Sequence, residues 1–458
     1  MPLIHARVRL GSLLLALVAI GFFNRPASAR PAEDDGWQAG VAQIVITPDK
    51  FMWMTGYGGR TKPAEGRETD LYAKATALRD PNGRTAVFIS TDLIGVPIKM
   101  VRAVSKTIKQ QYGLERANLM FTCSHTHCGP ALDDMLSHML AMKERDWKEV
   151  RAYQQTLNAR IVRVIGAAIK DLKPARLATG IGRATFASNR RAPIGLGPYD
   201  HEVPVLEIRS ADGARLRGLV FGYACHNTTM GFYKWFGDYA GYAQLTLQQR
   251  HPGCVAMFFN GCGGDQNPLP RKKLSLARKY GTMLADAVDE VVASHPQTVH
   301  GSLRTAFRTI NLQLDTLPSK SKIKSQLTDG NRYLRQRAAV LLEEIRKNGK
   351  LRSSYPYPVQ VWMLGNNVTW VALGGEVVVD YSLRLKRELG PGRTWVTGYA
   401  NDVMAYIPSE RVLKEGGYEG ATSMIYYQLP TKWKTGLEQQ IVKTVRTMAR
   451  DLQTVRSE

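Results

Sequence analysis

The sequence has few of the features that would divide a chain into modules or hold it in a bilayer. Beyond residue 23 it contains no apolar run near the roughly 20 residues that a membrane-spanning helix needs. It also contains no Ser/Gly/Pro-rich linker and no internal repeat, either of which would mark independent modules. We therefore expect residues 30–458 to form one large domain, with one lobe or two.

Acidic residues are scarce: 39 Asp and Glu stand against 62 Lys and Arg, which gives a formal net charge of +23. Such a surplus favours anionic partners, such as an anionic membrane or envelope surface. The basic residues are scattered rather than gathered into one stripe, and the export expected below also argues against nucleic acid as a partner. A solvated basic surface without a specific partner is the simpler interpretation.

The first residues have the pattern of an export signal. Arg7 and Arg9 precede an apolar run from Leu10 to Phe23, and Ala27-Ser28-Ala29 supplies small residues for cleavage. We expect a signal peptide over residues 1–29 and a periplasmic or secreted protein that starts near Arg30. An uncleaved anchor is the alternative, although the apolar run is short for a membrane span.

The five cysteines are an odd number for an oxidising compartment. Cys254 and Cys262 flank an apolar run which, if straight, would hold them about 26 Å apart, too far for a disulfide. Cys123 and Cys225 both end apolar runs just before a loop with a histidine. A disulfide between them and a free buried pair both remain open.

Apolar periodicity predicts alternating strands and helices. We expect helices over residues 97–112, 145–172, 239–250, 274–294, 320–347, 377–389 and 434–452. We expect strands over residues 43–47, 71–79, 85–90, 118–123, 177–187, 203–208, 216–225, 255–260, 302–314, 357–364, 368–373 and 394–399. This order predicts an α/β fold with mixed β-sheets flanked by helices.

Polar residues come just after five of the predicted strands: Asp92, His125, His226, Asp265 and Asn401. In open α/β sheets the carboxyl ends of the strands are where binding sites collect. Packing alone does not explain five polar loops at five strand ends, so we expect a functional site there.

Two histidines, His125 and His127, stand two residues apart in the stretch from Asn118 to Pro130. If the backbone is extended there, both side chains face one cavity. Imidazole is the commonest protein ligand of transition metals and a general acid or base near neutral pH. Two solvated loop histidines fit this stretch alone equally well.

A series of short motifs follows in order along the chain. They are Gly56-Tyr57-Gly58, Asp70 to Ala75, Ser124 to Pro130, Asn189-Arg190, Ala224 to Thr229, Gly237 to Ala243, Gly264 to Pro268, Gly375-Glu376, and Asn401 to Tyr406 followed by Tyr418-Glu419. In this order they resemble the amino-terminal catalytic domain of neutral (non-lysosomal) ceramidases. The resemblance covers nearly the whole chain after residue 30.

The resemblance implies one Zn²⁺ and a set of site residues. The implied ligands are His125, His226, Glu376 and Tyr406. His127 would be the catalytic acid/base, and Arg190 and Tyr418 would polarise or orient the substrate. Each role has a structural alternative: a core histidine for His226, a helix cap for Glu376, and packing for the two tyrosines.

One position departs from the family pattern. The family has a serine that is central to its activity in a Gly-Asp-Val-Ser-Pro loop, and this chain has Asn267 there, in Gly264-Asp265-Gln266-Asn267-Pro268. Asparagine cannot act as an alkoxide nucleophile, although it donates and accepts hydrogen bonds. We expect ceramide hydrolysis to be weak or absent.

The leading hypothesis is an exported zinc-dependent hydrolase of an amide bond, in a small-molecule or N-acyl lipid substrate. An esterase or a small-molecule amidase on the same metal is the alternative among enzymes. A catalytically inactive binding protein with the same fold is the alternative outside them.

Overall fold

A large mixed sheet ends in the loops that carry His125, His127 and His226. The computed structural model describes residues 36–133, 135–191 and 193–454; the expected signal peptide, residues 1–29, lies outside them. Within these ranges the sheet has nine strands in the order β11-β9-β8-β6-β1-β3-β4-β5, with β13 also paired to β6. The pairs β4–β5 and β9–β11 are parallel and the others antiparallel. The bounds are β1 (Gln38–Val45), β3 (Tyr72–Arg79), β4 (Thr85–Thr91), β5 (Leu119–Cys123), β6 (Lys173–Arg183), β8 (Glu202–Ser210), β9 (Leu216–Tyr223), β11 (Val255–Asn260) and β13 (Gln297–Thr298).

A second sheet of four strands packs on one face of the first. Its order is β14 (Leu303–Gln313), β15 (Ser354–Leu364), β16 (Val368–Leu373) and β18 (Thr394–Thr397). The ring of Trp370 lies 5.0 Å from the rings of both Phe88 and Phe259, which belong to the large sheet. Each tryptophan buried there removes roughly 150–250 Å² from water, worth at most about 4–6 kcal/mol.

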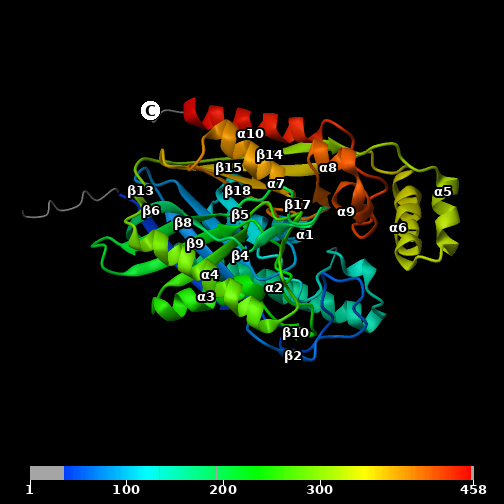
Figure 1. Cartoon of the computed structure of the whole chain (residues 1–458), viewed down its shortest axis with the longest axis horizontal. Helices are drawn as coiled ribbons and strands as arrows, with labels where there is room; N and C mark the ends of the chain where they lie inside the picture. The colour runs from blue at the N-terminus through cyan, green and yellow to red at the C-terminus, as the bar shows by residue number, and fades with distance from the viewer. Residues whose placement is uncertain (1–35, 134, 192, 455–458) are drawn as a thin grey trace, which may run out of the picture. The chain divides into compact units, whose positions relative to one another are not determined.

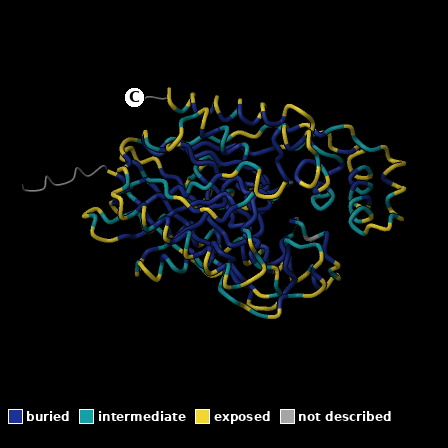
Figure 2. Tube along the Cα trace, viewed as in Figure 1, coloured by how far each residue is buried: buried dark blue, intermediate teal, exposed yellow. Residues whose placement is uncertain are grey.

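Helices cover the outer faces of both sheets (Figure 1). Side chains alternate along a strand, so that Phe258 faces helices α3 (Asp238–Arg250) and α4 (Leu274–Ala293) while Phe259 faces the second sheet. Helices α1 (Ile98–Tyr112) and α2 (Glu144–Lys170) pack on the same face of the large sheet, and α2 lies mainly over β1 and β3. Helices α7 (Val379–Leu389) and α10 (Leu437–Thr454) pack on the second sheet. Figure 2 shows buried residues concentrated in the sheets and exposed ones along the outer helices.

Short elements complete the described chain. They are β2 (Gly66–Arg67) with β10 (Lys234–Trp235), β7 (Ala187–Asn189) with β12 (Gln266–Pro268), β17 (Glu376–Val377) with β19 (Tyr406–Ile407), and helices α5 (Lys320–Ser325), α6 (Arg332–Asn348), α8 (Glu410–Glu415) and α9 (Gly417–Gly420). Single 3₁₀ turns span Arg116–Asn118, Ser137–Met139, Gln326–Thr328 and Thr422–Ile425. In the described part of the chain, no helix combines the length and apolar character that crossing a membrane requires.

The fold class is confirmed: mixed sheets are flanked by helices. The prediction of one continuous helix over residues 320–347 is wrong. Asp329 and Gly330 interrupt it, and Asn331 starts a new helix by accepting a hydrogen bond from the backbone N–H of Tyr333 at 2.9 Å.

Two smaller predictions also need correction, and one open question is decided. The strand expected over residues 177–187 ends at Arg183, and its last residue, Ala187, begins β7, which pairs elsewhere with β12. The helix expected from residue 377 begins at Val379, and the Glu376 side chain does not cap it. Of the two alternatives left open for Cys123 and Cys225, the structure has the one without a disulfide: both are buried and unpaired, as are the other three cysteines.

Candidate active site

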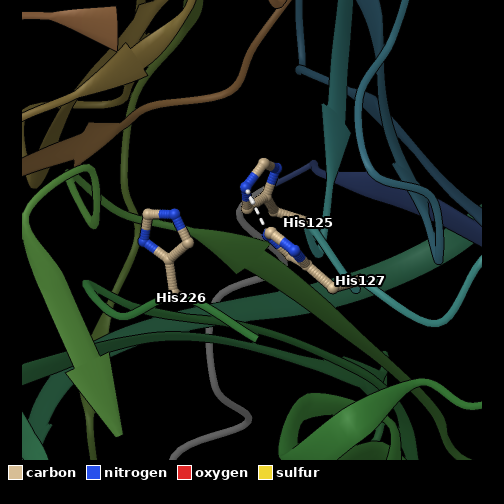
Figure 3. Close-up of side chains that lie close together, drawn as sticks. All are labelled: His125, His127 and His226. Atoms are coloured by element: carbon tan, nitrogen blue, oxygen red, sulfur yellow. Dashed lines mark hydrogen bonds between the residues drawn. The ribbon is translucent and has the colours of Figure 1, made fainter. Parts of the chain in front are cut away.

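Three histidines meet where the loops after β5 and β9 run side by side. Thr126 and Asn227 form a parallel bridge between these loops, and the Asn227 side-chain amide donates to the carbonyl of Ser124. The bridge brings the ligand nitrogens of His125, His127 and His226 within 4.8 Å of one another (Figure 3). All three histidines are buried.

His125 and His127 direct their rings toward the same place, as predicted, but not by an extended backbone. The Nε2 atoms of the two rings lie 3.2 Å apart. His125 has a left-handed backbone conformation, with φ of 60°, which is rare for a residue with a side chain. A turn after β5, rather than the pleat of a strand, directs both rings to the same place.

Glu376 and Tyr406 reach the histidines through a two-residue strand pair. Strands β17 and β19 are parallel, and Glu376 lies opposite Tyr406 in their register. The Oε2 atom of Glu376 lies 3.2 Å from Nε2 of His125 and 3.1 Å from Nε2 of His226. The Tyr406 hydroxyl lies 3.3 Å from Nε2 of His226. The structure thus brings together all four residues that the resemblance implies as ligands.

The protonation states of this cluster call for a cation. Nδ1 of His125 donates to the carbonyl of Ile94 at 2.5 Å, and Nδ1 of His226 donates to that of Gly263 at 2.6 Å. In a neutral imidazole this leaves Nε2 with a lone pair. Burial lowers the pKa of His226 to about 4, so its ring is neutral at pH 7. The buried Oε2 atom of Glu376 accepts no hydrogen bond.

Oε2 of Glu376 lies 3.1–3.2 Å from the Nε2 lone pairs of His125 and His226, and such atoms repel unless a positive ion lies among them. Zinc takes histidine nitrogen and carboxylate oxygen at about 2.0–2.2 Å in a tetrahedron, which separates neighbouring ligand atoms by about 3.3 Å. Two imidazole nitrogens and one carboxylate oxygen are ligand types that zinc takes, so the donor set fits zinc.

His127 lies beside this cluster in a different environment. Burial lowers the pKa of His127 well below its usual range, and His125 and His226 lower it further. Its Nδ1 has no hydrogen-bond partner, and its carbonyl accepts from Nη2 of Arg60 at 2.6 Å. The ring of Tyr57 packs on it at 4.7 Å. Gly56 is required next to it, because a Cβ atom there would lie 2.8 Å from Nδ1 of His127.

Arg190 links the cluster to the loop with Asn267. Strands β7 and β12 pair, and the backbone N–H of Arg190 donates to the carbonyl of Asp265 at 2.8 Å. Its guanidinium donates to Glu419 at 2.8 Å, to the Tyr406 hydroxyl at 3.1 Å and to Oδ1 of Asn267 at 3.5 Å. Burial would lower the pKa of Arg190, but Tyr406 and Glu419 raise it well above its usual value, so it stays charged.

A cavity of about 820 Å³ opens above these groups, and its lining includes His127, Arg190, Asn267, Tyr406 and Tyr418. The ring of Tyr418 lies 5.2 Å from that of Tyr406, and it is 43% exposed, at the mouth of the cavity. The predicted catalytic residues thus line one cavity.

The sequence reasoning missed two tyrosines that contact the ligands. The Tyr427 hydroxyl donates to Oε1 of Glu376, and the ring of Tyr399 packs on His125 at 4.4 Å. For Tyr427 the one signal was the richness in tyrosine of the stretch after residue 399, which does not show which tyrosine faces a ligand; Tyr399 ends the expected strand and gave no signal.

Three of the five polar residues at strand ends serve the loops rather than the cavity. Asp92 accepts from the backbone N–H of Tyr72 at 3.0 Å, Asp265 from that of Val379 at 2.9 Å, and Asn401 from that of Phe121 at 3.2 Å. They fix the turns that carry the site.

Comparison with known proteins gives a consistent result. The family described as "Neutral/alkaline non-lysosomal ceramidase, N-terminal" matches residues 37–306. Neutral ceramidase B of Dictyostelium discoideum is 26% identical over 276 residues, which are 53% of this chain and 37% of that protein. The chain therefore spans well under two thirds of that relative's length.

Two solved structures have the same fold. Neutral ceramidase from Pseudomonas aeruginosa superposes with a TM-score of 0.70 and 20% identity, over 91% of this chain and 75% of that one. A ceramidase complexed with C2 gives a TM-score of 0.71 and 20% identity, over 92% and 77%. With more than half of its residues matched by the family description, this chain belongs to the neutral/alkaline non-lysosomal ceramidase family.

Proposed function

We propose that this protein is a zinc-dependent hydrolase of an amide bond in a small-molecule or lipid N-acyl substrate. The observation that carries the proposal is the convergence of three lone-pair atoms, from His125, His226 and Glu376, beneath a cavity that also holds His127. Membership of a family whose named relatives are ceramidases supports an amide as the substrate. The leader-like residues 1–29 support export.

His125, His226, Glu376 and Tyr406 would hold the metal. Zinc bound there supplies a water with a pKa near 7 and polarisation of a carbonyl group. His127 is neutral and beside the ligands, so it can accept a proton and return it to the leaving amine. Arg190 and Tyr418 lie on the opposite side and orient the acyl part by hydrogen bonds.

Asn267 makes ceramide itself a poor candidate. Its Oδ1 accepts from Arg190 at 3.5 Å and from the Thr228 hydroxyl at 3.4 Å. An amide in this position orients neighbours but supplies no alkoxide. The substrate is therefore an N-acyl amide whose head group differs from that of ceramide.

Two single substitutions test the proposal. His125→Ala removes a metal ligand, so zinc content and amide hydrolysis should fall together. His127→Ala should keep zinc and slow amide hydrolysis about 100-fold to 10,000-fold, as expected for a lost general acid/base. The slowdown should be smaller on an activated phenyl ester, whose leaving group needs no proton. His251→Ala, where the replaced ring contacts Asp289 away from the cavity, is the matched control.

Zinc is measured by elemental analysis of protein purified without added metal, and folding by thermal melting. Less than a tenth of an equivalent of zinc, with no uptake on titration, would remove the basis of the proposal. Full activity in both His125→Ala and His127→Ala would show that the active site lies elsewhere. Zinc binding without turnover of any amide or ester would favour a binding protein.

A further inference from the structure

The cavity above the metal ligands carries more positive than negative charge. Its charged lining consists of Arg190, Arg191, Arg271, Glu415 and Glu419. The two glutamates are already engaged: Glu419 pairs with Arg190 at 2.8 Å and with Arg191 at 2.6 Å, and Glu415 pairs with Arg191 at 3.0 Å. Arg271 makes no ion pair or side-chain hydrogen bond with any described residue and is left as an uncompensated cation.

The backbone holds Arg271 in place on both sides. The Tyr280 hydroxyl donates to the carbonyl of Pro270 at 2.6 Å, and the backbone N–H of Lys272 donates to that of Thr229 at 2.7 Å. Lys272 has a positive φ of 76°, a strained conformation for a residue with a side chain, and such strain is often kept at functional sites. The guanidinium is therefore presented from a fixed point.

Arg271 stands between the main cavity and a second one. This side cavity, of about 380 Å³, is lined by Tyr57, Thr228 to Gly231, Arg271 and Lys272. Tyr57, Thr228 and Arg271 line both cavities, so the two adjoin along these residues. Lys272 adds a second cation without a side-chain partner among the described residues.

A buried acid near Tyr57, Asp238, does not neutralise this pair. Burial raises the pKa of the Tyr57 hydroxyl. The negative charge of Asp238 raises this pKa further and the positive charge of Arg271 lowers it, because Asp238 and Arg271 both lie near Tyr57. The Asp238 carboxylate, however, accepts from the backbone N–H groups of Thr229, Met230 and Tyr239. It is occupied by the loop and forms no ion pair with Arg271.

The position of Arg271 indicates which half of the substrate it meets. Tyr57 packs directly on His127, so Arg271 and the side cavity lie on the His127 side of the metal ligands. Arg190 and Tyr418 lie on the other side, near His226 and Tyr406. If His127 protonates the leaving amine, the amine half extends toward Arg271.

We propose that Arg271, assisted by Lys272, binds an anionic group on the amine half of the substrate, so that the preferred substrates are N-acyl amides of an acidic amine. This inference rests on the proposed amide hydrolysis for its orientation. The anionic group is a carboxylate, sulfonate or phosphate, all of which a guanidinium binds by charge-assisted hydrogen bonds. A neutral head group would leave both cations without a partner.

A matched substrate pair tests the proposal. N-Dodecanoylglycine and its neutral primary amide, N-dodecanoylglycinamide, differ in charge and little in size. We expect kcat/KM to be about 10-fold to 100-fold higher for the acid, a preference that Arg271→Gln reduces to within about threefold. The preference should also weaken with added salt, since both cations are partly open to solvent. Arg163→Gln, on the exposed face of α2 with no side-chain partner among the described residues, is the control for net charge.

Two further acids identify the anion. N-Dodecanoyltaurine carries a sulfonate and N-dodecanoyl-O-phosphoethanolamine a phosphate, and a preference for either that depends on Arg271 supports the same site. Equal rates on acid and neutral amide in the wild type, or an undiminished preference in Arg271→Gln, would overturn the proposal while leaving the hydrolase intact.

Binding of an uncleavable pair separates this inference from the proposed function. In the ketone analogues of the same acid and amide, a methylene replaces the amide nitrogen. Calorimetry should show tighter binding of the acidic ketone to the wild type, with the difference lost in Arg271→Gln, even if no amide is hydrolysed. Equal binding of the two ketones to the wild type would overturn the inference independently of turnover.

Discussion

Replacing Tyr427 by Phe tests the metal site without touching a ligand. The Tyr427 hydroxyl donates to Oε1 of Glu376, while Oε2 of the same carboxylate faces the two histidines. Burial raises the pKa of Tyr427 well above its usual value, so the hydroxyl keeps its proton and remains a donor at neutral pH. Phe keeps the ring and its packing against Tyr406 and removes only the hydrogen bond.

Loss of a partner that orients a metal-binding carboxylate typically weakens metal binding 10-fold to 100-fold. This corresponds to about 1.4–2.7 kcal/mol, in line with one hydrogen bond to a charged group. Competition with a chelator of known zinc affinity measures the shift directly and requires no substrate. Tyr426→Phe is the matched control, because Tyr426 is half-buried like Tyr427 but its hydroxyl makes no hydrogen bond with the described residues. Zinc affinity within twofold of the wild type in a folded Tyr427→Phe protein would refute the reasoning.

Three other outcomes follow from the structure. Glu419→Gln breaks the buried ion pairs of Glu419 with Arg190 and Arg191, and should lower the free energy of unfolding by about 3 kcal/mol and the melting temperature with it. Turnover should also slow, because Arg190 loses the carboxylate that holds it in place. An unchanged melting temperature would contradict this. Burial raises the pKa of Asp402 from 3.8 to about 7, so its contribution to stability is complete below about pH 4 and is lost as the pH rises through 7. The free energy of unfolding, measured with denaturant, should therefore fall between pH 5 and pH 8 by roughly 2–3 kcal/mol less in Asp402→Asn than in the wild type. The same pH dependence in both proteins would disprove the raised pKa of Asp402. Release of fatty acid from a short-chain ceramide should be weak in the wild type and rise in Asn267→Ser, whereas robust wild-type turnover would show that Asn267 does not limit it.

Local signals explain which elements the sequence could predict. Pro97 and Gly113 bound the first helix in the sequence, and the structure has α1 between them with Gly113 in the left-handed conformation. Such signals act within a few residues. The break at Asp329-Gly330 was missed, because the charged residues on both sides keep the composition of one long helix.

Among the site residues, too, some could be predicted from local signals in the sequence and others only from the fold. The spacing of His125 and His127 could be read locally, and the structure places the two rings side by side. Glu376 and Tyr406 meet only because two-residue strands pair in parallel, and no periodicity reveals a pair so short. They were predicted through the resemblance alone. Arg271 carried no signal at all, since its importance depends on which carboxylates the fold assigns to its neighbours.

The backbone around the site is strained where it carries function. Among the described residues other than glycine, those with positive φ include His125, Asp238, Lys272, Tyr399 and Asn401. Each such conformation typically costs about 1–3 kcal/mol and persists only when surrounding contacts determine it. Those contacts are present: Nδ1 of His125 donates to a carbonyl, and Asp238 and Asn401 accept from backbone N–H groups. The fold holds these turns against their own preference. The ligand nitrogens, and the backbone from which the cavity cations extend, therefore keep fixed positions before substrate arrives, which is what electrostatic catalysis and charge recognition require.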